Sequence, residues 1–107
     1  MPDMPSFFVH EKADNDLEEI FDYSVKNFGF ARAVRYIKDI EAMFSELAHD
    51  PLKGKSFDPE LPHCFHKRVE SHFIYYAPCD GGIEIFRILH ERMLPSLHLA
   101  GGIDDLD

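Results

Sequence analysis

Two helical hydrophobic patterns, separated by a single glycine, constrain the fold of this chain more than any other feature. Over residues 13–28 the apolar side chains recur at offsets that place them on one face of a helix, with charged residues opposite. The same period returns over residues 30–48 and ends before Pro51, because the residue preceding a proline is pushed out of the helical region. Gly29, between the two patterns, supplies the positive φ usual just past a helix end. So short a connection predicts two antiparallel helices in a hairpin.

The remainder of the chain contains strand patterns that can cover this hairpin. We expect strands at residues 7–9 (at a sheet edge), 64–69, 72–77 and 83–90. The third ends at Pro78, and the fourth, the longest and most apolar, is expected at the centre of the sheet. The turns at residues 70–71 and 80–82 are too short for anything but antiparallel pairs. The predicted fold class is α+β, with an N-terminal strand and an antiparallel α-helical hairpin packed on an antiparallel β-sheet.

The length of 107 residues fits one domain spanning residues 1–107. Leu94, Leu97 and Leu99 can pack back on this domain. Residues 100–107, which begin with a glycine pair and end in aspartates, are expected to form a flexible acidic tail.

The net charge limits the class of partner. Lys and Arg number 11 against 20 Asp and Glu, which gives −9 at neutral pH. A protein that binds nucleic acid by neutralising phosphates is therefore unexpected. Residues 52–92 balance six basic against six acidic side chains and also contain four histidines, so we place the available positive potential there.

Cysteine usage and the N-terminus indicate a cytoplasmic protein without a membrane segment. Cys64 and Cys79 are too few for a disulfide scaffold, and neither a basic leader nor a long apolar run is present in the sequence. His63, Cys64 and His66 lack the paired spacing of a structural zinc site, so no metal or other cofactor is expected.

Several short patches, in order, resemble the ParE-type toxins of the ParE/RelE toxin-antitoxin superfamily, which includes plasmid stabilisation proteins. The resemblance covers roughly residues 7–99 and shares the strand, helical hairpin and antiparallel sheet derived above. Its patches are Ala13 with Asp16, Leu17 and Ile20; Phe28 and Gly29 with Ala33 and Tyr36; Phe44, Leu47, Ala48, Pro51 and Gly54; and, most specific, residues 72–76 followed by 83–93.

The resemblance implies a type II toxin that is held silent by a co-encoded, ParD-like antitoxin. ParE-type toxins poison DNA gyrase by protein-protein contact, whereas RelE-type relatives with the same fold cut messenger RNA on the ribosome. The fold cannot choose between these targets, so the choice depends on the site.

RNA cleavage by a 2′-hydroxyl needs a general base, a general acid and cations, which RelE-type relatives place on the sheet. The candidates here are Lys67, Arg68, Tyr75, Tyr76, Arg87 and His90. Arg87 and His90 lie three residues apart, so in a regular strand they point to opposite faces and form no dyad. The negative charge also opposes approach to dense phosphate.

Arg87 and the strand aromatics have alternative interpretations. Arg87 can pair with a carboxylate such as Glu84 or Glu70, or can anchor an acidic group of the antitoxin. Tyr75 and Tyr76 fit a pair with one side chain in the core and one on the surface better than a platform on which bases stack. A less acidic antitoxin segment that folds on binding is expected to cover Phe86 or Tyr76.

The sequence thus favours a non-enzymatic, gyrase-directed toxin in which residues 87–93 are the most important part. The expected contacts with target or antitoxin are Lys67, Arg68, Tyr76, Phe86, Arg87, His90, Arg92 and Met93. Two alternatives stay open. One is a ribosome-dependent mRNA endonuclease that uses Arg87, His90 and Tyr75 or Tyr76, and the other is an inactive homologue that acts only as a binding module.

Overall fold

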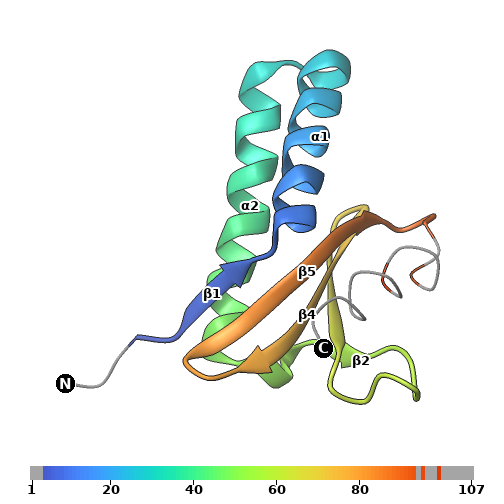
Figure 1. The fold of residues 1–107 in the computed structure, drawn as a ribbon. Coiled ribbons are helices and arrows are strands. Elements are labelled where there is room, and N and C mark those ends of the chain that lie inside the picture. The colour runs from blue at the N-terminus through green and yellow to red at the C-terminus, as the bar shows by residue number, and fades with distance from the viewer. Residues whose placement is uncertain (1–3, 94, 96–98, 100–107) are drawn as a thin grey trace.

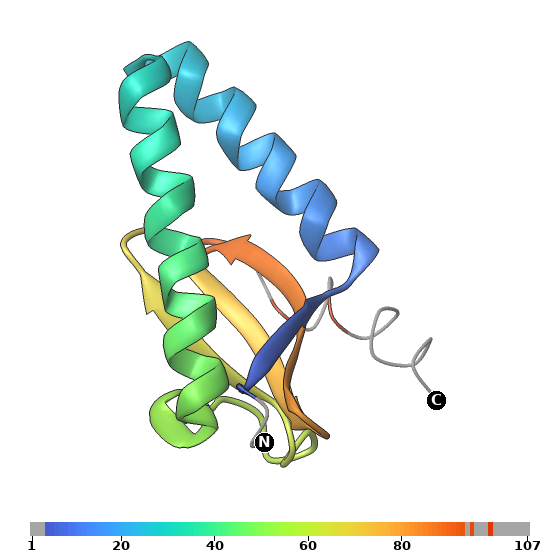
Figure 2. The same ribbon diagram turned by 90° about the vertical axis from the view of Figure 1, so that its left-hand side faces the viewer.

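The helical hairpin predicted from the two hydrophobic patterns is confirmed. The structure is a computed structural model that describes residues 4–93, 95 and 99. Helix α1 (Glu11–Phe28) and helix α2 (Phe30–His49) run antiparallel, and Gly29 between them has a φ of 91°. The Gly29 end of the hairpin extends beyond the sheet, whereas the other end packs on it (Figures 1 and 2).

A five-stranded sheet covers the hairpin on one side. Its strands are β1 (Ser6–Val9), β2 (Lys55–Ser56), β3 (Phe65–Val69), β4 (His72–Cys79) and β5 (Gly82–His90), and a short 3₁₀ helix, η1 (Pro51–Lys53), precedes β2. The spatial order is β1-β5-β4-β3-β2, with antiparallel pairing among β2 to β5. Strand β1 lies at an edge, as expected.

The observed sheet differs from the predicted one in three details. Strand β1 pairs parallel with β5, so the sheet is mixed, and the two-residue strand β2 was not expected. Strand β5 lies inside the sheet, between β1 and β4, as expected of a central strand. Strand β5 needs a neighbour on each side, and β1 supplies the second one after the long helical crossover. Strand β4 also continues through Pro78 to Cys79, because a proline next to a hairpin turn removes at most one ladder hydrogen bond.

The core has two parts, one on each face of the sheet. The larger lies between sheet and helices and includes Ile40, Phe44, Leu47, Ile74 and Tyr76, all nearly inaccessible to solvent. The smaller lies on the opposite face and contains Cys64, Tyr75, Ala77, Phe86, Leu89 and Leu99.

The burial of Leu99 in the smaller core confirms that this residue packs on the domain. The expectations for Leu94, Leu97 and the acidic tail lie outside the described residues. Among the described helices, none is long and apolar enough to cross a membrane.

Candidate functional site

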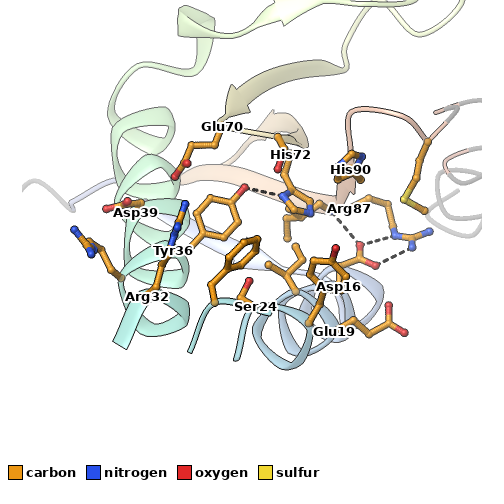
Figure 3. Close-up of a pocket in the computed structure, with 17 residues that line it drawn as sticks. Asp16, Glu19, Ser24, Arg32, Tyr36, Asp39, Glu70, His72, Arg87 and His90 are labelled. Carbon is orange, nitrogen blue, oxygen red and sulfur yellow. Dashed lines mark hydrogen bonds and ion pairs between the residues drawn. The ribbon is translucent and has the colours of Figure 1, made fainter. Parts of the chain in front are cut away.

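A cavity of about 1040 Å³ lies between the two helices and the end of the sheet where β5 terminates. Side chains from α1, α2, the start of β4 and the end of β5 line it (Figure 3). Arg87, His90 and Met93 belong to the lining, so the cavity includes part of the segment 87–93 that the sequence favoured.

Asp16 and Arg87 form an ion pair at one side of this cavity. The Arg87 guanidinium donates from Nε to Asp16 Oδ2 at 2.8 Å and from its terminal nitrogen to Oδ1 at 2.9 Å. Asp16 is buried, with 6% of its surface exposed, and also accepts the backbone N–H of Ile88 at 3.0 Å. These hydrogen bonds raise the pKa of Arg87, so the guanidinium stays charged.

The sequence interpretation paired Arg87 with a carboxylate such as Glu84 or Glu70, but the observed partner is Asp16. Glu84 instead lies 3.3 Å from the His10 ring nitrogen. Asp16 occupies an otherwise apolar helix stripe, four residues before the buried Ile20. A carboxylate at such a position needs a cationic partner, and this was the signal that the sequence offered.

The register of β5 keeps Arg87 and His90 on opposite faces, as the sequence predicted. Arg87 pairs with Tyr75, whose ring lies in the core of the opposite face, and His90 pairs with His72. The pairing between them is regular, because the β-bulge at Phe86 precedes both residues. Both residues nevertheless line the cavity (Figure 3), since Asp16 holds the Arg87 guanidinium beside the Ile88 N–H.

Tyr36 and His72 form a second polar group in the cavity, which the sequence interpretation missed. The Tyr36 hydroxyl lies 2.6 Å from His72 Nδ1 and 3.0 Å from the Val69 carbonyl oxygen. The rings of His72 and His90 approach edge to face, with centroids 5.3 Å apart. Burial, with a smaller contribution from His90, lowers the pKa of His72 to about 4, so its ring is neutral at pH 7.

The remaining nuclease candidates do not join this group. Tyr76 is fully buried on the helix side, where its hydroxyl donates to the Pro51 carbonyl and accepts from the Gly54 N–H. Tyr75 is buried in the core of the opposite face. The expected division of the two tyrosines into core and surface was therefore wrong.

The other predicted contact residues differ in exposure. Phe86 is buried in the smaller core together with Leu99, so an antitoxin is not needed to cover it. Lys67 is half-buried on β3, and Arg68 forms an ion pair with Glu91. Arg92 is exposed, and Met93 is exposed at the rim of the cavity. Within the described residues, no group of three or more His, Cys, Asp or Glu side chains could hold a metal ion.

A helical hairpin on one face of a small mixed sheet defines the class of this protein, which is the ParE/RelE fold. The family model for the ParE toxin of the type II toxin-antitoxin system parDE matches residues 7–95. The chain therefore belongs to the ParE toxin family.

Individual relatives agree with this assignment. The toxin ParE of Escherichia coli is 30% identical over 91 residues, covering 84% of this chain and 88% of the relative. The chromosomal ParDE toxin-antitoxin system of P. aeruginosa contains a chain that superposes with a TM-score of 0.69 at 25% identity, over 81% of this chain and 96% of that one. A chain of the Mycobacterium tuberculosis RelBE2 toxin-antitoxin complex shares the fold, with a TM-score of 0.55 at 23% identity over 79% and 95%.

Proposed function

We propose that this chain poisons DNA gyrase by protein-protein contact and is neutralised by a co-encoded, ParD-like antitoxin. The observation that best supports a non-enzymatic mode of action is the engagement of Arg87 by buried Asp16. A guanidinium that stabilises a transition state must aim its donors at the developing charge. Those of Arg87 are instead used to join α1 to β5.

The other groups that RNA cleavage would need support the same proposal. The hydroxyl of Tyr76 is already hydrogen-bonded to backbone groups, and Tyr75 lies on the other face of the sheet. Arg68 pairs with Glu91. Of the nuclease candidates that line the cavity, His90 alone has no carboxylate partner among the described residues.

The antitoxin proposal follows from the family and from its relatives. The family is that of the parDE toxin-antitoxin system, and the similar chain from P. aeruginosa comes from such a system. We still propose that the segment 87–93 contacts the target. Because residues 87–90 are buried or half-buried, the contact is expected mainly at the exposed Arg92 and Met93. Contacts at Lys67, Arg68 and His90 remain part of the proposal.

Pulse labelling tests the target directly. The chain is induced without an antitoxin in bacteria, and incorporation of labelled thymidine and methionine is followed over the first minutes. We expect DNA synthesis to fall while protein synthesis continues, and purified gyrase to lose supercoiling activity on addition of the chain. A fall in protein synthesis first would contradict the gyrase proposal.

The ribosome-dependent endonuclease is the second candidate, and one observation favours it. Arg87 and His90 line one cavity with His72, whose ring is neutral at pH 7. Cleavage of messenger RNA in a purified translation system, abolished by His90→Ala, would establish this activity. If expression is harmless and neither effect occurs, the chain acts only as a binding module.

A further inference from the structure

The Gly29 end of the helical hairpin is the basic part of an acidic protein. Residues 23–38 contain four basic and no acidic side chains, whereas the rest of the chain contains 7 basic and 20 acidic ones. We call residues 23–38 the hairpin end. Its tip at Gly29 extends beyond the sheet in both views of the fold (Figures 1 and 2), whereas Tyr36 at its base contacts the sheet.

Asp22 and Asp39 flank the hairpin end, but no ion pair within the described part of the chain neutralises its basic side chains. Its four basic residues are all exposed, and none of them forms an ion pair with another described residue. They are Lys26, Arg32, Arg35 and Lys38. Because the rest of the chain as a whole carries net negative charge, an acidic partner is attracted more strongly to the hairpin end than to the remaining surface.

Large aromatic side chains are exposed on the same end. Tyr23, Phe28 and Phe30 expose 64%, 54% and 67% of their surface. The Arg32 guanidinium lies 4.7 Å from the centre of the Phe28 ring, so the two side chains are already ordered against each other. Tyrosine and arginine are the side chains most enriched where binding energy concentrates in interfaces, and ordering before binding reduces the entropic cost.

The hairpin end and the proposed target contact meet at one cavity. Tyr23, Phe28, Arg32 and Arg35 line it from the helices, and Met93 lines it from the end of the sheet. The two surfaces are therefore continuous across the cavity mouth.

We infer that the hairpin end docks on an acidic, concave face of the folded protein that the toxin attacks. A projecting pair of helices is complementary to a hollow, which a folded partner offers and a single extended antitoxin segment does not. Nucleic acid is disfavoured because the whole chain carries −9, which repels phosphate at long range. The inference rests on the proposed function only in that the chain is a toxin with a protein target.

Charge reversal at the hairpin end is the direct test. We expect Arg32→Glu/Arg35→Glu to abolish growth arrest on induction and to weaken binding to purified DNA gyrase by about tenfold or more. Both positions lie in the first two turns of α2, where added carboxylates complement the helix dipole, so the variant should fold. Tyr23→Ala/Phe28→Ala, which keeps the charge, should weaken the same binding. Thermal melting by circular dichroism verifies the fold of each variant.

The matched control is Lys12→Glu/Lys55→Glu, which makes the same charge change at exposed positions outside the hairpin end. It should arrest growth as the parent chain does. If the hairpin-end variants also arrest growth like the parent chain, the inference is overturned and the gyrase proposal stands. A second outcome separates the two proposals. If growth arrest requires an intact hairpin end but purified gyrase keeps its activity, the hairpin end is confirmed as a docking surface and the gyrase proposal is wrong.

Two further results would overturn the inference. If the parent chain causes no growth arrest, it has no toxic target in the cell, and both the gyrase proposal and the docking inference are wrong. Tight binding of a labelled single-stranded RNA by the parent chain, lost in Arg32→Glu/Arg35→Glu, would instead assign the hairpin end to nucleic acid.

Discussion

Asp16 on α1 holds Arg87 on β5 through two hydrogen bonds of 2.8 and 2.9 Å, and one of its oxygens also accepts the Ile88 N–H. The contact is placed just after the β-bulge at Phe86, where the ladder of β4 and β5 is irregular. A single buried carboxylate thus accepts hydrogen bonds from a half-buried cation and from a backbone donor next to the irregular point of the strand. We regard this pair as the main polar link between helix and sheet.

Removal of Asp16 should therefore be costly. We expect Asp16→Ala to lower the free energy of unfolding by about 3 kcal/mol, because it removes the buried acceptor shared by the Arg87 guanidinium and the Ile88 N–H. In Asp16→Leu/Arg87→Met much of this loss should be regained, since no unpaired charge remains. Urea denaturation measures both values.

Glu84→Ala is the control for this prediction, because it removes a carboxylate from a half-exposed pair with His10. Its cost should stay within about 1 kcal/mol. Equal losses in Asp16→Ala and Glu84→Ala would show that the buried pair is not a main link between helix and sheet.

Gly82, at the start of β5, allows the close approach of β1. A Cβ added there would lie 1.6 Å from the Ser6 carbonyl oxygen, and the residue has a φ of 153°. We expect Gly82→Ala to cost about 3 kcal/mol and to expose the β1 amides to hydrogen exchange. Gly81→Ala is the comparison, since its Cβ meets nothing within 4 Å and only the φ of 83° is strained. We expect Gly81→Ala to cost about 1 kcal/mol. If Gly81→Ala costs more than Gly82→Ala, the close contact between Gly82 and β1 does not limit the residue at position 82.

Tyr36 links α2 to the β3–β4 turn through a single hydroxyl. That hydroxyl donates to the Val69 carbonyl and contacts His72 Nδ1. Tyr36→Phe should therefore cost about 1–2 kcal/mol in thermal or urea unfolding. Tyr23→Phe removes an exposed hydroxyl without a described hydrogen bond and should change stability by less than about 0.5 kcal/mol. Indistinguishable variants would mean that the Tyr36 hydroxyl contributes nothing to the link.

Periodicity predicted the helices and the antiparallel strands because both are local patterns of burial. The stripe from Ala13 to Ile20 and the φ of Gly29 follow from the residues themselves. The parallel pairing of β1 with β5 joins segments more than seventy residues apart, and nothing in residues 7–9 distinguishes a parallel from an antiparallel neighbour.

The site was less predictable because it depends on tertiary contacts. Arg87 and His90 alternate along β5 as expected, and it is the Asp16 carboxylate on α1 that holds the Arg87 guanidinium at the cavity. Asp16 was visible as a carboxylate in an apolar stripe, although its partner was not. His72 was read only as a strand residue, since its contact with Tyr36 requires the tertiary fold.

His72 gives the unfolding free energy a pH dependence of definite sign. Burial lowers its pKa from 6.5 to about 4 in the folded state, so between these values the unfolded chain binds the additional proton. Stability is therefore complete above about pH 6.5 and is lost as the pH falls toward about 4, by about 2 kcal/mol once the partial exposure of the ring is considered. Urea denaturation at several pH values in this window measures the loss. His72→Gln lacks the titrating ring and should show a shallower slope, whereas carboxylates contribute equally to both proteins. Equal slopes would mean that the ring is protonated without leaving its place beside Tyr36, and the neutral His72 on which the endonuclease alternative depends would be lost with it.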